Sequence, residues 1–245
     1  KKLTIQGTVK VDSSDELANL YQIARRAKDS DNSENAAKYY EMILIKDPNS
    51  WEANFYTVYF KAMSCKIGEI YNEANNVNNC VKPVLELIKA NVKDPSEQQK
   101  AVCEVADRTL QLAQMLYNGA LNHFNQFKSV QGQANESSND LYSCGKIAYT
   151  LGDEIYANFD SALYKDRITK AWSQGVECFR NASGAYLMAQ GNILEPQKQI
   201  AIQYCSKMKE LDPNVTVPAV NSGCMVLLAI VMSPFIAALG WLLFG

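Results

Sequence analysis

The most reactive side chains in this 245-residue chain are seven cysteines. No two of them form a C-x-x-C pair, which is the spacing that zinc sites and redox motifs use. Most fall in helical patterns, where a free cysteine behaves as a small apolar residue. We therefore expect free thiols, a reducing compartment and no metal site within this chain. The cysteines are Cys65, Cys80, Cys103, Cys144, Cys178, Cys205 and Cys224.

The single histidine, His123, is the other candidate for chemistry. It stands beside Phe124 and Phe127, with no cysteine or acidic residue at a motif spacing, so we expect a packed or surface histidine rather than a general base. Gly145 and Lys146 lack the glycine loop of a phosphate-binding motif. Neither a nucleophile elbow, a zinc-protease helix nor an EF-hand loop occurs. The sequence predicts no catalytic residues and no cofactor, and hence a protein that is not an enzyme.

The amino-acid composition indicates which secondary structure the chain adopts. With 47% apolar residues, 12 glycines and 7 prolines, the chain favours helices over a turn-rich β fold. The formal net charge is −2 with both signs interspersed, which argues against a broad basic face for nucleic acid. We expect an all-α protein that does not itself bind nucleic acid.

Local signals place the helices. Residues 1–12 are expected to form a lead-in, and Ser13 with Glu16 reads as a capping box that opens a helix. Apolar residues at helical spacing form one stripe on that helix, and Asp31 with Glu34 can cap the next, whose inward residues include Ala36, Tyr40, Ile43 and Leu44. Further helices are predicted near 51–65, 95–127 and 195–211. The stripe comprises Leu17, Leu20, Ile23, Ala24 and Ala27.

The middle of the chain is harder to divide. Pro83 is expected to start a fresh turn, and the small polar residues 129–140 are expected to form a loop. Helix should follow over 141–187, with Gly152, Asp160 and Gly175 as candidate breaks. The predicted domain spans residues 13–217, as an α-solenoid of hairpins or as a plain helical bundle.

Residues 17–48 resemble a tetratricopeptide repeat. That repeat is a helix–turn–helix with small residues where the helices cross, an aromatic residue on the second helix and a closing proline. Ala24, Ala36, Tyr40 and Pro48 stand at the corresponding offsets. The resemblance implies a concave face that binds a protein or peptide partner.

The longer stretch Asp15–Ile70 resembles a family of largely uncharacterised bacterial proteins, common in Firmicutes. There the same helical segment usually follows a short zinc ribbon, and residues 5–9 look like the junction between the two. This chain has no ribbon cysteines, so a zinc ribbon is expected only outside it. The resemblance implies a helical fold and no established reaction.

The end of the chain predicts a membrane anchor. No charged residue occurs from Val215 to Gly245, and residues 224–245 are almost continuously apolar. A helix of that length matches the hydrocarbon core of a bilayer. Lys207 and Lys209 precede it, which favours a cytoplasmic helical domain and a single C-terminal span over 218–245. The alternatives are a buried C-terminal core helix and a hairpin helix in a larger assembly.

Candidate partner-binding residues follow from the repeat. Tyr21, Arg25 and Lys28 share one face of the first helix. If the register continues, the equivalent set on the third helix is Phe55, Tyr59 and Ala62, of which the two aromatic residues are the candidates. Such a groove would suit a peptide with a carboxylate and an apolar anchor. The alternatives are that Phe55 and Tyr59 are core residues and that the two cations are solvated. Tyr21 and Arg25 stand where carboxylate-clamp repeats have lysine and asparagine, so that specific activity is not predicted.

The sequence therefore predicts a non-enzymatic, membrane-tethered interaction module, a scaffold or adaptor. One alternative is a self-assembling membrane structural protein whose tail oligomerises. Another is a regulator completed by a nucleic-acid-binding zinc ribbon upstream.

Overall fold

The computed structural model describes residues 13–30, 32–190 and 195–220, and within these ranges it is helical and contains no strand. The all-α prediction is therefore confirmed, while the lead-in at 1–12 lies outside the described residues. The elements are α1 (Ser13–Asp29), α2 (Ser33–Lys46), α3 (Trp51–Met63), the short 3₁₀ helix η1 (Ile67–Glu69), α4 (Ile70–Asn91), α5 (Pro95–Phe127), α6 (Gln133–Asn158), α7 (Lys165–Gln190) and α8 (Glu195–Leu211).

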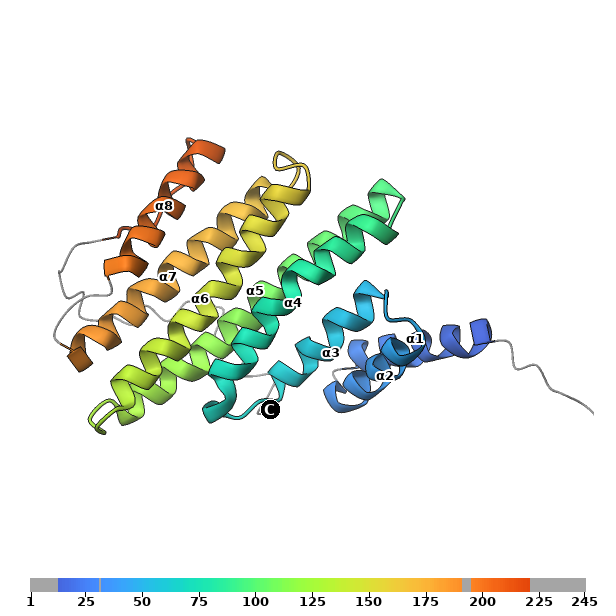
Figure 1. The fold of residues 1–245 in the computed structure, drawn as a ribbon, viewed down its shortest axis with the longest axis horizontal. Helices are drawn as coiled ribbons and strands as arrows, with labels where there is room; N and C mark the ends of the chain where they lie inside the picture. Colours follow the sequence, from blue (N-terminus) through green and yellow to red (C-terminus); the bar gives the residue numbers. More distant parts are fainter. Residues whose placement is uncertain (1–12, 31, 191–194, 221–245) are drawn as a thin grey trace, which may run out of the picture.

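The helices form an extended array in which most contacts join helices close together in the chain (Figure 1). α3 to α8 lie side by side with similar tilts, and α1 and α2 cross this row at one end. The main longer-range contacts are between α4 and α6, with smaller ones from α3 to α5 and from α5 to α7. One continuous apolar core runs through the array.

The first hairpin packs much as its residue pattern predicts. Ala24, Ala36 and Tyr40 are fully buried. The small side chains of Ala24 and Ala36 thus stand where α1 and α2 cross. Ile23, by contrast, is 41% exposed and does not belong to the buried stripe. The reason is that α1, at the end of the array, packs chiefly against α2, so only a narrow face of it is covered.

Side-chain caps set several helix ends. Asn32 caps α2, its side chain accepting a hydrogen bond from the Asn35 amide at 3.2 Å, while the predicted cap, Asp31, lies outside the described residues. Ser50 does the same for α3, and Asp94 does it for α5 immediately before Pro95. The predicted starts at Pro95 and Glu195 agree with the structure.

The turn expected at Pro83 is absent, because α4 continues through it from Ile70 to Asn91. Pro83 is exposed, so the carbonyl that loses its hydrogen bond can be solvated on the outer face. Fully buried Val84, Leu85 and Ile88 hold the helix against the core on the other side. Tertiary packing thus outweighs the local cost of proline.

The loop expected at 129–140 is wrong from Gln133 onward, where α6 begins. The chain reverses in a tight turn in which Gly132 adopts φ +86°, a left-handed conformation that favours glycine. Ser137 and Ser138 are buried, and Ser138 Oγ donates to the Ala182 carbonyl of α7 at 2.9 Å. Polar residues with poor helix propensity are held in a helix here by contacts with another element.

Two of the candidate breaks, Gly152 and Gly175, lie inside helices, and only the one at Asp160 is real. These glycines, with Gly145, allow α6 and α7 to approach closely. A methyl group at Gly175 would lie 2.4 Å from Tyr149 Cε1, and one at Gly152 would lie 2.5 Å from Trp172 Nε1. The glycines therefore serve packing, not chain reversal.

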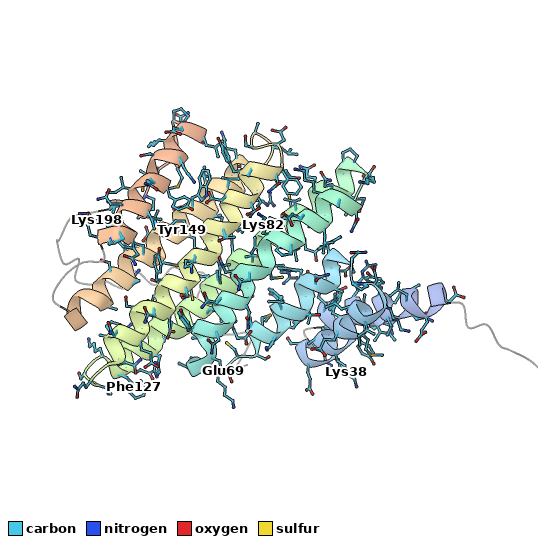
Figure 2. The ribbon with its side chains drawn as sticks, viewed as in Figure 1. Lys38, Glu69, Lys82, Phe127, Tyr149 and Lys198 are labelled. Carbon is cyan, nitrogen blue, oxygen red and sulfur yellow. The ribbon has the colours of Figure 1, made fainter. Side chains whose placement is uncertain are left out.

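Asp153 of α6 fixes α8 to the array. Its carboxylate accepts from Trp172 Nε1 at 3.1 Å, from the Tyr204 hydroxyl at 2.6 Å and from Lys207 Nζ at 3.1 Å. The Tyr204 ring stacks on Tyr149 with ring centroids 3.9 Å apart, and Figure 2 shows Tyr149 in this region. One carboxylate thus joins α6, α7 and α8.

None of the helices in the described ranges is both long enough and apolar enough to span a bilayer. The predicted anchor at 218–245 lies outside the described residues except for its first three positions, which are irregular. Just before it, Val215 and Val217 pack against the core, and the Cys205 thiol lies 3.5 Å from the Pro218 carbonyl.

Candidate functional site

The polar ends of the three predicted partner-binding residues on α1 are bonded within the chain. Tyr21 donates through its hydroxyl to Ser50 Oγ at 2.6 Å and lies 3.3 Å from Asp47 Oδ2, at the turn between α2 and α3. The Arg25 guanidinium sits over the Tyr21 ring, 5.1 Å from its centroid. Partial burial is the main cause of the raised pKa of Tyr21.

Arg25 forms a forked ion pair with Glu52 of α3. Its Nε and Nη2 atoms lie 3.0 and 2.6 Å from the two carboxylate oxygens. The fully buried Tyr40 hydroxyl donates to the same carboxylate at 2.8 Å. Burial is the first cause and Glu52 the second of a raised Tyr40 pKa, so Tyr40 stays a neutral donor. Glu52, also in the first turn of α3, is therefore stabilised from three directions.

Lys28 pairs with Glu104 of α5, its Nζ lying 2.9 Å from Oε1. Tyr56 donates its hydroxyl to the same oxygen, and Lys28 Nζ stands 4.6 Å from the centre of the Tyr56 ring. Burial opposes ionisation of Glu104, but the hydrogen bonds from Tyr56 and Lys28 outweigh it and leave the pKa of Glu104 lowered. Lys28 thus ties α1 to α5.

The structure places Phe55 and Tyr59 in the core, at 3% and 6% exposure. Their rings lie 5.6 Å apart within a cluster of aromatic side chains that also includes Tyr40, Tyr56 and Phe60. Their burial matches the core alternative and does not support the groove assignment, which stays an untested prediction for these two residues. They are covered because α3 packs against α2, α4 and α5.

A pocket of about 360 Å³ nevertheless opens beside Tyr21 and Arg25. We call it the α1–α3 pocket. It lies where α1, the α2–α3 turn and the end of α4 meet, and its lining combines aromatic rings, the Arg25–Glu52 pair and side-chain amides. The lining residues are Tyr21, Arg25, Asp47, Asn49, Ser50, Trp51, Glu52, Asn91 and Val92. A ligand carboxylate here would compete with Glu52 for Arg25.

A second pocket of about 320 Å³ surrounds His123, at the end of the array where α4 begins, α5 ends and α6 begins. We call it the His123 pocket; Figure 2 labels Glu69 and Phe127 on this end. It is lined by Ile67, Gly68, Tyr71, Asn72, His123, Gln133, Glu136, Asn139 and Asp140. His123 Nδ1 lies 3.2 Å from the amide nitrogen of Gln133, and its ring contacts Phe127.

Sequence reasoning missed the two carboxylates of this second pocket. The sequence pattern predicts a loop over Glu136 and Asp140, although they stand four residues apart and share a face when the segment is helical. Among the described residues, no group of three or more histidine, cysteine or acidic side chains has a metal-binding arrangement, and the six described cysteines are free thiols.

Comparisons with family models and with curated proteins found no match: no protein-family model matches the chain, and no curated protein is significantly similar to it in sequence. The resemblances to a tetratricopeptide repeat and to the zinc-ribbon family therefore stay predictions.

Proposed function

We propose that this chain is a non-enzymatic interaction module that binds a polypeptide partner at the α1–α3 pocket. The observation that carries the proposal is the position of that pocket on the face of α1 that contains Tyr21 and Arg25. Its half-buried Trp51 offers an apolar anchor site, and the side chains of Asn49 and Asn91 offer hydrogen bonds to a peptide backbone. Lys28, Phe55 and Tyr59 are not part of the proposed surface, because Lys28 is engaged with α5 and the other two are buried.

The pairing of Arg25 with Glu52 changes the expected ligand. A partner carboxylate gains little where the cation already has a buried counter-charge. We therefore favour a neutral, extended or helical segment with one aromatic or large aliphatic side chain for the pocket.

The test is selection of peptides from a random library against the full 245-residue chain kept in mild detergent. We expect saturable binding that weakens by roughly tenfold or more in Trp51→Ala, as loss of an interface anchor does. The matched control is Ile45→Ala, which removes an 82% exposed side chain outside the pocket. Peptides that bind both variants equally, or a failure to select any, would refute the proposal.

We further propose that residues 218–245 tether the module to a membrane. The uncharged stretch from Val215 to Gly245 supports this. The full chain should stay in the membrane pellet after alkaline carbonate extraction, and the chain shortened to residues 1–217 should be released. Release of the full chain would instead favour a buried or self-associating tail.

A further inference from the structure

The His123 pocket contains a buried carboxylate with no counter-charge. Asp140 is 9% exposed, and no described residue donates a hydrogen bond to its carboxylate or forms an ion pair with it. The nearest charged group is another carboxylate, Glu136, one helical turn earlier on α6. An unpaired buried charge is costly, and proteins usually pair it, neutralise it or use it to bind a ligand.

Within the described ranges, the other two buried carboxylates, Glu52 and Glu73, are both paired. Glu52 meets Arg25 at 2.6 Å, and Glu73 lies 3.5 Å from Lys61 Nζ with a further hydrogen bond from Asn76. Asp140 is the exception among the buried acidic residues of the described ranges. Glu52 also lines a pocket, but its charge is paired there with Arg25, whereas Asp140 faces its cavity without a cation.

We propose that the His123 pocket binds a protonated primary amine, with the ammonium between Asp140 and Glu136. The Tyr71 ring lines the pocket and is half-exposed, so it offers a face to the cation, and the side-chain carbonyls of Asn72 and Asn139 can accept further ammonium protons. The cavity of about 320 Å³ is large enough for the alkyl chain of a lysine or a small diamine.

The arrangement favours ammonium over other cations. A guanidinium matches one carboxylate through its planar fork, whereas an ammonium directs three N–H bonds apart and can reach two separate carboxylates. A divalent metal ion is not favoured, because no described cluster of three or more ligating side chains exists. The site lies between α4, α5 and α6 and does not depend on the proposed partner surface at α1.

The test uses n-butylammonium as the probe, added to the full chain in non-ionic detergent at 150 mM salt, a physiological ionic strength at which surface charges are screened beyond about 8 Å. Thermal unfolding and saturation-transfer NMR report binding. We expect a saturable rise in Tm for the parent protein and no rise with 1-butanol, its neutral analogue. Asp140→Asn should weaken binding by roughly tenfold or more, since it removes the buried charge that pairs with the ligand. Glu136→Gln should weaken it less, because Glu136 is exposed.

Glu41→Gln is the matched control, since Glu41 is an exposed carboxylate on α2 outside both pockets. It should bind the probe as the parent protein does. The proposal is overturned if butylammonium gives no saturable effect, if Asp140→Asn binds it unchanged, or if butylguanidinium binds more tightly. Two further probes distinguish the sources of the amine: tighter binding of N-acetyl-lysine methylamide indicates a lysine of a polypeptide, and tighter binding of putrescine indicates a free diamine. Both outcomes support an amine site.

Discussion

Two carboxylates of this protein show how the surroundings of a side chain determine its contribution to folding stability. Glu52 accepts hydrogen bonds from Arg25 and Tyr40 and lies in the first turn of α3, whereas Asp140 is buried next to Glu136 with no cation. The Glu52 charge has partners in the folded state, whereas burial of the unpaired Asp140 charge opposes folding. Both differences can be measured as changes in the free energy of unfolding.

We expect Asp140→Asn to raise the free energy of unfolding at pH 7 by about 1–2 kcal/mol in the absence of ligand. Burial, then the Glu136 charge, raises the pKa of Asp140 to about 6, from an unfolded value near 3.8. Between these two pH values the folded state holds more protons than the unfolded state, so this group makes stability fall as pH rises from about 4 to 6. Urea unfolding of parent and variant at several pH values measures the difference. If the difference in free energy of unfolding between variant and parent does not grow from about pH 4 to 6, the raised pKa of Asp140 is contradicted.

We expect Arg25→Ala to lower the free energy of unfolding by about 1–2 kcal/mol, because it leaves the Glu52 carboxylate without its cation. The effect is moderated because the Arg25 side chain is 56% exposed. Arg26→Ala is the control, since Arg26 is exposed on the same helix and forms no ion pair with a described residue. Urea denaturation of both variants compares them. Equal losses would mean that the pair contributes little.

At the scale of the helix, the close packing of α6 against α7 depends on glycines in their interface. A Cβ at Gly175 meets the ring of Tyr149, which itself packs under Tyr204 of α8. The ring cannot move without disturbing α8. Close packing of this kind makes an added methyl group costly even where it would favour helix formation.

We expect Gly175→Ala to destabilise the protein by about 1–3 kcal/mol. Gly184→Ala, on the same helix but with open space around its Cβ position, should instead stabilise by up to about 1 kcal/mol through helix propensity. Thermal unfolding of the two variants therefore gives shifts of opposite sign. Shifts of the same sign would show that α6 and α7 are packed less tightly than described.

Local signals predicted the helices that begin at a proline or a capping side chain. The Asp94–Pro95 and Glu195–Pro196 starts agree with the structure, and so do Ala24, Ala36 and Tyr40 in the first hairpin. The errors occur where contacts with an element distant in the sequence determine the local structure. The serines of α6 are helical because they pack against α7. Pro83 does not interrupt α4 because the core holds the helix on its other side. Gly175 does not break α7 but makes room for the Tyr149 ring. Missing the start of α6 also hid the carboxylate pair of the His123 pocket.

At the scale of the whole molecule, each end of the array is held by few neighbours. α8 contacts α7, and it is attached to α6 by the hydrogen bonds of Tyr204 and Lys207 with Asp153 and by the stacking of Tyr204 on Tyr149. A terminal helix of a linear array opens more easily than an internal one, because it loses only one interface.

We expect Asp153→Ala to increase amide hydrogen exchange in α8, over Glu195–Leu211, while exchange in α4 and α5 stays unchanged. Trp172, Tyr204 and Lys207 would lose their shared acceptor, and α8 would detach locally rather than unfold the array. Glu154→Ala is the control, because Glu154 bonds only to Asn158 on its own helix. Uniformly faster exchange throughout the described residues would contradict local opening.

The order of packing along the chain has a consequence for synthesis. Each helix rests mainly on helices just before or after it in sequence, so the contact order is low. Each hairpin can therefore dock onto its predecessor while the next is still leaving the ribosome. The closest interface, between α6 and α7, forms only after Lys165–Gln190 has emerged, so the first half of the chain must stay folded on its own aromatic cluster until then. A growing chain arrested after α5 should already protect α2 and α3 from proteolysis.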